Sequence, residues 1–119
     1  MKGDRLYLRH ILDAIEKIEN YIAVGREVFL STSHWQDAVV RQLEIIGEAT
    51  KRLSKTLCSQ HNDIPWRRIA GLRDVLIHDY MGVDVNAVWE VTQKNLPFLK
   101  TRIESILKEL ENLKELEKT

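Results

Sequence analysis

The sequence predicts an all-α protein, an antiparallel four-helix bundle with a short additional helix. Apolar residues recur at three- and four-residue spacing along most of its 119 residues, which is typical of helices with one buried face. Gly and Pro are few, at 5 and 2, which favours long regular elements. No stretch alternates apolar and polar residues well enough to predict a strand. No repeat or change of composition divides the chain, so we expect one domain over residues 1–119.

The first helix is expected from about Asp4 to Val24. Asp4 is a plausible N-cap, and Gly25 is a plausible end of the helix. Its buried stripe comprises Leu8, Ile11, Leu12, Ile15, Ile18 and Ile22.

The second helix is expected from about His34 to Leu57, after a polar connector at residues 31–33 that offers caps. Gly47 lies inside this helix, where glycine costs about 1 kcal/mol relative to alanine. We therefore expect another helix, or the backbone of a ligand, to approach closely there. The inner face comprises Trp35, Ala38, Val39, Gln42, Ile45, Ile46, Ala49 and Leu53.

A short third helix is expected from Pro65, which suits a first turn, to about Ile77. The fourth begins near Val85, after Asp84 as its N-cap, and Pro97 should kink or break it. From about residue 98 a narrow apolar stripe continues to the C-terminus, either packing on the bundle or contacting a partner. The stripe comprises Ile103, Ile106, Leu107, Leu110, Leu113 and Leu116.

Composition limits the possible functions. Lys and Arg together number 18, as do Asp and Glu, so the net charge is zero, whereas a general nucleic-acid coat protein is usually basic. Any RNA binding must therefore use a local patch or a partner. The single cysteine, Cys58, excludes an internal disulfide and a thiolate metal cluster. No apolar run approaches the roughly 20 residues of a membrane span, and the N-terminus lacks the apolar core of a signal peptide, so we expect a cytoplasmic protein.

The segment Arg73-Asp74-Val75-Leu76-Ile77-His78-Asp79-Tyr80 carries the residues with the most chemistry. On an ideal helix, five residues turn the chain by about 140° and seven by about 340°. Arg73 and Tyr80 would then share a face, and His78 would point away. Either the helix loosens near His78, or a two-fold axis brings two copies together, so that both contribute to one cleft.

Arg73 and His78 are the candidate catalytic residues. A histidine with a pKa near about 6.5 can take or give a proton at neutral pH. An arginine fork binds phosphate oxygens and offsets the charge that develops on them. This pair suits metal-independent cleavage of RNA through its 2′-hydroxyl. The ordinary alternative is a solvated helix face, or ion pairs with Asp74 or Asp79.

Several neighbours could support such a site. Asp74 and Asp79 could pair with Arg73 or tune His78, and Glu48 could orient an arginine in the cleft. The candidate RNA contacts are Arg67, Arg68 and Lys51. The remaining histidines, namely His10, His34 and His61, are expected to be structural or exposed, because no second ligand stands at metal spacing. The tryptophans are expected to anchor the core or an interface, and Cys58 to be inert.

The motif resembles the R-x-x-x-x-H-x-Y motif of HepT-like proteins in the HEPN superfamily. Two further stretches resemble that family: residues 46–49 (I-G-E-A), and Pro65-Trp66 leading into residues 69–73. The resemblance implies an all-α homodimer with the Arg/His motif at the dimer cleft. It also implies a toxin of a toxin–antitoxin pair, acting as a metal-independent endoribonuclease without a cofactor. Its antitoxin would be an MntA-type nucleotidyltransferase that silences the toxin by transferring AMP to Tyr80.

Two other functions remain open. The bundle could be a non-catalytic nucleotide-binding or substrate-positioning subunit of a separate nucleotidyltransferase, which near-neutral charge fits somewhat better. It could also be a purely structural protein that binds a partner through its C-terminal stripe. Neither DNA nor a membrane is an expected partner.

Overall fold

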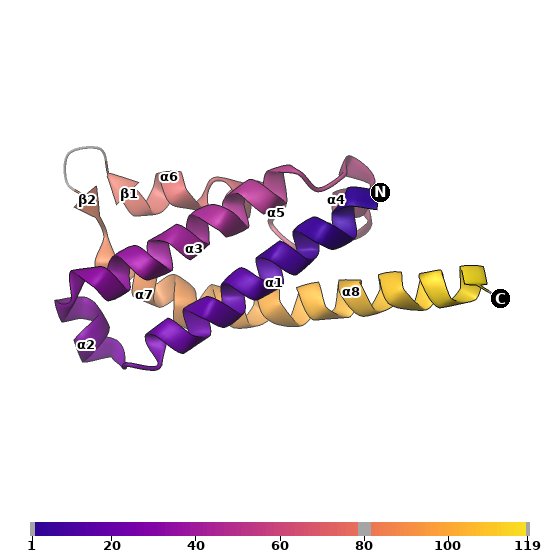
Figure 1. Cartoon of the computed structure of the whole chain (residues 1–119). Helices are drawn as coiled ribbons and strands as arrows, with labels where there is room; N and C mark the ends of the chain where they lie inside the picture. Colours follow the sequence, from indigo (N-terminus) through magenta and orange to yellow (C-terminus); the bar gives the residue numbers. More distant parts are fainter. Residues whose placement is uncertain (1, 79–81, 119) are drawn as a thin grey trace.

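Three long helices form the body of the protein in a computed structural model, which describes residues 2–78 and 82–118. They are α1 (Lys2–Ile22), α3 (Ser33–Lys51) and α8 (Leu96–Lys118), and α1 packs against both of the others (Figure 1). The core between them is apolar, and it includes the fully buried side chains of Leu8, Ile11, Ile15, Ile18, Phe29, Val39, Leu43, Ile46, Ile103 and Ile106. The prediction of an all-α architecture is confirmed, apart from one very short pair of strands.

The start of α1 differs from its prediction. The helix begins at Lys2, so Asp4 lies inside it and is not its N-cap. The Asp4 carboxylate instead accepts two hydrogen bonds from Ser54, from the backbone N at 2.8 Å and from Oγ at 2.6 Å. Asp4 is 2% exposed, so this contact is part of the interior. Gly25, which has a φ of 94°, follows α1 and allows the chain to turn, as expected.

The predicted second helix is interrupted. The chain forms α3, then a break, then α4 (Lys55–Gln60). At the break, Ser54 is extended and caps α4, because its Oγ accepts a hydrogen bond from the backbone N of Leu57 at 3.1 Å. The prediction of a continuous helix to Leu57 was wrong because Ser54 donates to Asp4 and also caps α4. Local periodicity does not reveal a polar contact between residues fifty positions apart.

A short helix before α3 was not predicted. It is α2 (Arg26–Ser31), and it fills the stretch between the predicted first helix and the expected connector at residues 31–33, of which it includes only Ser31. Its single fully buried side chain, Phe29, stacks at a tilt on Trp89, with ring centroids 5.4 Å apart. One buried residue in six produces no periodic signal, so tertiary packing stabilises this helix.

Gly47 has the role that its position suggested. A Cβ atom placed on it would lie 3.2 Å from the carbonyl oxygen of Ala70, so α3 and α5 (Trp66–Ala70) approach each other backbone to backbone. Of the two explanations for a glycine there, the close approach of a helix is the one found.

The predicted third helix is divided at Gly71 into α5 and α6 (Leu72–Leu76). After Leu76 the backbone becomes extended, and β1 (Ile77–His78) pairs antiparallel with β2 (Gly82–Val83). Each strand has two residues, and within residues 2–78 and 82–118 this pair is where the expectation of no strands was wrong. The backbone N of Asp84, the residue after β2, also donates to the carbonyl oxygen of Leu76 at 3.0 Å. This hydrogen bond joins the end of β2 to the end of α6.

The predicted fourth helix is continuous but irregular. It comprises α7 (Val85–Glu90), a π-helical turn η1 (Val91–Asn95), and α8. Asp84 caps α7 as predicted, its Oδ1 accepting from the backbone N of Ala87 at 3.1 Å. Pro97 neither donates a backbone hydrogen bond nor ends the helix, and the wider π turn lies immediately before it.

The C-terminal stripe divides into two parts. Ile103, Ile106 and Leu107 are buried in the core, whereas Leu113 and Leu116 are 56% and 70% exposed. The last turns of α8 extend past the N-terminal end of α1 (Figure 1). Within the described residues, no helix is both long and apolar enough to cross a membrane.

Candidate active site

The two predicted catalytic residues lie on different kinds of backbone. Arg73 is the second residue of α6, and His78 ends β1, beyond the last helical residue, Leu76. The ideal-helix relation, which would turn His78 away from Arg73, therefore does not apply across this segment. Backbone positions are what the structure describes for this pair. Asp79 and Tyr80 lie outside the described residues, so their predicted roles stay predictions.

Three sets of contacts hold α5 and α6, which lead to His78. Helix α3 packs against both α5 and α6, with Gly47 at the closest approach. Leu76, the last residue of α6, is buried in the core, and its carbonyl oxygen accepts from Asp84. At the other end, the indole Nε1 of Trp66 donates to the carbonyl oxygen of His61 at 3.0 Å. The segment from Trp66 to Leu76 is thus a fixed support for the residues after it.

Asp74 lies in the first turn of α6, with an exposed side chain. Its backbone N donates to the carbonyl oxygen of Gly71 at 3.0 Å, which closes the turn between α5 and α6. Asp74, a predicted supporting residue, follows Arg73 in the chain, and its carboxylate faces solvent on α6.

Arg67 and Arg68 line a groove. Its walls come from α5 and α6 on one side and from η1 and the start of α8 on the other, and its volume is about 630 Å³. Both arginine side chains are exposed. Leu72, the residue before Arg73, also lines the groove, so these two candidate RNA contacts share a depression that adjoins the motif.

Glu48 and Lys51 lie elsewhere. They pair with each other on the outer face of α3, where Lys51 Nζ is 3.4 Å from Glu48 Oε1. Glu48 lines a second, smaller depression of about 390 Å³, together with Tyr7 and His10 of α1. The structure therefore does not bring Glu48 into the groove of Arg67 and Arg68.

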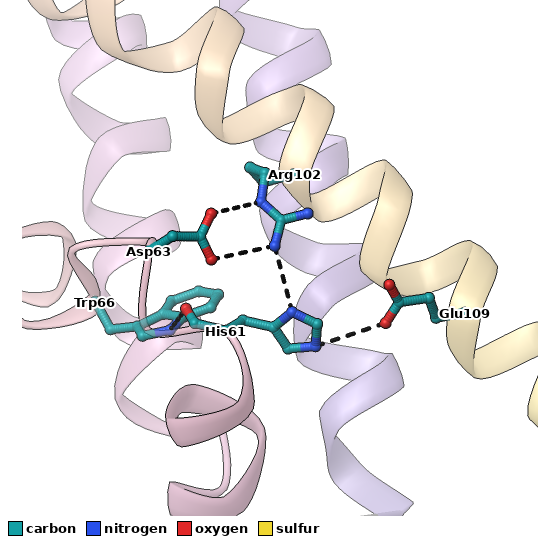
Figure 2. A network of polar contacts seen from close by, with 5 residues as sticks. All are labelled: His61, Asp63, Trp66, Arg102 and Glu109. Carbon is teal, nitrogen blue, oxygen red and sulfur yellow. Dashed lines mark hydrogen bonds and ion pairs between the residues drawn. The ribbon is translucent and has the colours of Figure 1, made fainter.

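A polar network that the sequence did not predict fixes the loop before α5 (Figure 2). Arg102 of α8 binds both carboxylate oxygens of Asp63, at 2.8 and 3.2 Å. Its Nη2 also lies 3.4 Å from Nδ1 of His61, whose Nε2 is 3.7 Å from a carboxylate oxygen of Glu109. The hydrogen bond from Arg102 lowers the pKa of Asp63 below its ordinary value. His61 is thus structural, one of the two roles expected for it, and the network ties the support of the motif to α8.

Two further residues of the groove were missed. Lys94 of η1 pairs with Glu90 at 2.8 Å, and Phe98 of α8 is 49% exposed. Phe98 lies one position away from the buried stripe of Leu96, Leu99 and Ile103, so its helical phase was the available signal for an exposed aromatic ring.

The side chains that commonly bind metals are dispersed in the described part of the chain. No cluster of three or more His, Cys, Asp or Glu side chains there is arranged to hold a metal ion. Cys58 is a free thiol, and burial, followed by the nearby charge of Asp4, raises its pKa.

The chain matches a family model described as "Ribonuclease HepT-like" over residues 11–106. It is 44% identical over 108 residues to a protein of Caldanaerobacter subterraneus subsp. tengcongensis named "Putative RNase", covering 90% of this chain and 96% of that one. It is also 44% identical over 103 residues to the "Probable ribonuclease HepT" of Thermococcus cleftensis, covering 86% of this chain and 94% of that one.

A longer relative occurs in Methanocaldococcus jannaschii, named "Gamma-glutamylcyclotransferase and putative RNase". It is 45% identical over 114 residues, which cover 95% of this chain but 51% of the relative, so the chain spans about half of that protein. No solved structure matches the chain significantly.

Proposed function

Because the chain belongs to the ribonuclease HepT-like family, we propose that it is a metal-independent endoribonuclease and the toxin of a toxin–antitoxin pair. Arg73 and His78 are its catalytic residues, in a composite site at the cleft of a homodimer. Relatives of nearly the same length named as ribonucleases support the activity. The site itself rests on the residues of the motif.

One observation carries this assignment. Helix α6 ends at Leu76, two residues before His78, and the backbone of Ile77–His78 is extended. A single helix would separate the two side chains by about 140° around its axis, so they could not both contact one phosphate group. The change of backbone removes that obstacle. A loosening of the helix near His78 is one of the two arrangements that the spacing of the motif left open, the other being completion of the site across a two-fold axis.

The proposed reaction is a transesterification within the RNA. His78 takes the proton from a 2′-hydroxyl, whose oxygen forms a bond to the adjacent phosphorus. The bond from phosphorus to the 5′-oxygen of the next nucleotide breaks, and that oxygen receives a proton from an acid in the cleft. The products are a 2′,3′-cyclic phosphate and a 5′-hydroxyl. Arg73 binds the nonbridging phosphate oxygens and offsets their developing charge.

A homodimer supplies the second half of this chemistry. A two-fold interface pairs a patch with itself, so the one cleft of the dimer holds both copies of Arg73 and of His78. One histidine can then act as the base while the other acts as the acid. After one turnover the number of protons on the dimer is unchanged, but the two histidines have exchanged protonation states, so they exchange roles in the next turnover.

Tyr80 is the proposed off-switch. An MntA-type nucleotidyltransferase antitoxin transfers AMP from ATP to its hydroxyl, and pyrophosphate leaves. The added phosphate is negative and bulky, and Tyr80 is two residues from His78 in the chain. AMP there competes with RNA phosphate for Arg73 and blocks access to His78.

The activity is tested with a short RNA that has one cleavage site. The wild-type protein should release a 2′,3′-cyclic phosphate, and a 2′-deoxy nucleotide at that site should abolish cleavage. A product with a 3′-hydroxyl, or cleavage of the 2′-deoxy substrate, would contradict the proposed reaction.

The switch is tested by intact mass after incubation with the antitoxin and ATP. We expect added AMP units on the wild type and none on Tyr80→Phe, with Tyr21→Phe as the matched control that is still modified. An unchanged mass for the wild type would argue against the switch. A small nucleotidyltransferase gene beside this one would support the pairing. Tight nucleotide binding with no RNA cleavage would favour the alternative, a substrate-positioning subunit of that enzyme.

A further inference from the structure

The groove between α5 and α8 combines features that the catalytic pair does not explain. Its volume of about 630 Å³ lies within the range of roughly 300–1,000 Å³ typical of sites for small organic groups. The lining residues that matter here are Arg67, Arg68, Leu72, Lys94, Phe98 and Leu99. They give one depression a basic rim and an apolar wall.

The charge of the rim is local. Arg67 and Arg68 are both exposed, and none of the described residues that line the groove is acidic. Lys94 adds a third cation, partly offset by Glu90. In a chain of zero net charge this is the kind of local patch that binding to an anionic polymer requires.

The apolar wall includes an aromatic ring. Phe98 is half exposed beside the groove, although its neighbours Leu96 and Leu99 are buried. Nucleic-acid bases that are not paired stack on such rings, and every base has a face that can do so. Proteins that bind single-stranded nucleic acid commonly combine exposed aromatic rings with nearby cationic side chains.

The groove also adjoins the motif. Leu72 lines it, and Arg73 follows at the next Cα, about 3.8 Å along the chain. A nucleotide held here would therefore place its neighbouring phosphate close to α6.

We propose that this groove is a binding subsite for single-stranded RNA. One unpaired base next to the scissile phosphate stacks on Phe98, and Arg67 and Arg68 bind the adjoining backbone phosphates. This rests on the proposed ribonuclease function and adds that the substrate is unpaired where it is cut. A second copy of the chain fits the groove less well, because a two-fold contact would bring two basic rims together.

The subsite is tested by binding rather than by cleavage. A fluorescein-labelled oligonucleotide with 2′-O-methyl groups throughout cannot be cut, and its anisotropy gives a Kd for the full-length protein. We expect Phe98→Ala to weaken binding roughly ten- to a hundredfold, and Phe98→Trp to restore it. Leu113→Ala, at a similarly exposed apolar position of the same helix, is the matched control and should bind as the wild type does.

The arginines are tested through salt dependence. The double variant Arg67→Gln/Arg68→Gln should bind more weakly, and the slope of log K against log salt should become shallower by about 1.4, or about 0.7 for each phosphate that is no longer neutralised. Arg41→Gln, an exposed arginine beside the other depression, is the control and should keep the wild-type slope.

The outcomes separate this inference from the proposed function. If the wild type cuts RNA but the groove variants bind the oligonucleotide normally, the subsite is wrong and the ribonuclease assignment stands. If binding depends on the groove but no RNA is cut, the subsite stands and the ribonuclease assignment fails. If Phe98→Ala instead alters the oligomeric state, or binding of the nucleotidyltransferase, and leaves oligonucleotide binding unchanged, the groove is a protein interface and the proposal is overturned.

Discussion

Gly47 of α3 and Ala70 of α5 are in backbone contact, close enough that a Cβ atom at position 47 would lie 3.2 Å from the Ala70 carbonyl oxygen. This contact sets the distance between α3 and the segment that leads to Arg73. Because the near atom belongs to the backbone, relief of a clash must come from movement of α5 as a unit.

Substitutions at Gly47 should therefore separate stability from activity. In Gly47→Ala the helix gains up to about 1 kcal/mol from propensity, which offsets part of the clash, so the free energy of unfolding should change by less than about 1 kcal/mol. Gly47→Val should cost about 1–3 kcal/mol, because the larger side chain overpacks the contact. Both should lower ribonuclease activity more than Asp37→Ala does, a control at an exposed position of α3. Normal activity in Gly47→Val would contradict this positioning role.

The contact between Asp4 and Ser54 should dominate the junction between α1 and α4. Asp4→Ala leaves the backbone N and hydroxyl of Ser54 without their buried acceptor, and hydrogen bonds to a charged group contribute about 1.5–3 kcal/mol. We expect urea denaturation to show a loss of about 2 kcal/mol. Asp13→Ala, at an exposed position of α1, should stay within about 0.5 kcal/mol of the wild type. Equal effects of the two substitutions would contradict the assignment.

The ion pair of Asp63 and Arg102 predicts a dependence on pH. The folded-state pKa of Asp63 is lowered, chiefly by the hydrogen bond from Arg102. Its stabilising contribution is therefore complete above the ordinary pKa near about 4, and it is lost as the pH falls through the lower folded-state value. The difference in unfolding free energy between wild type and Asp63→Asn should shrink between about pH 7 and about pH 2.5. For Asp37→Asn, an exposed position on α3, no such trend is expected, and a constant difference for Asp63→Asn would refute the prediction.

The end of α8 after Asn112 should be dispensable for folding, whereas the part that contains Ile106 and Leu107 should not be. Truncation after Asn112 removes the exposed Leu113 and Leu116 and keeps Glu111, which pairs with Arg5 and Arg9. We expect this variant to keep nearly the wild-type thermal midpoint. Truncation before the fully buried Ile106 should unfold the protein, because it also removes Leu107 from the core. If the variant truncated after Asn112 does not fold, residues 113–119 contribute to stability and the prediction is wrong.

The sequence predicted the long helices well, because each has one continuous apolar stripe, as in α1 and the first half of α8. It failed where a distant contact overrides the local pattern. The break after Lys51 depends on Asp4, and α2 depends on the packing of Phe29 on Trp89. The end of α6 before His78 was open between two alternatives, because helical periodicity alone does not say where a pairing strand will begin.

The sequence names the candidate site residues, but it does not show which of them lie together. The roles of Arg67, Arg68 and Lys51 as RNA contacts stay predictions; Arg67 and Arg68 line one groove, to which the fold also brings Lys94 and Phe98. Glu48 was proposed to orient an arginine because it follows a glycine inside a helix; within the described residues it pairs with Lys51 and lies beside residues of α1, and its role in a dimer cleft stays a prediction. Composition and spacing identify reactive residue types, and packing decides which of them meet.

The central claim is that Arg73 and His78 cut RNA without a metal. The most direct measurement is the cleavage rate of a defined RNA by the purified protein in excess EDTA. It should be made for the wild type, Arg73→Ala, His78→Ala and the control His34→Ala, an exposed histidine outside the motif. We expect the wild type and His34→Ala to cut equally, and each motif variant to lose at least about a hundredfold in rate with an unchanged circular dichroism spectrum. Wild-type rates in His78→Ala, or loss of wild-type activity in EDTA, would contradict the account.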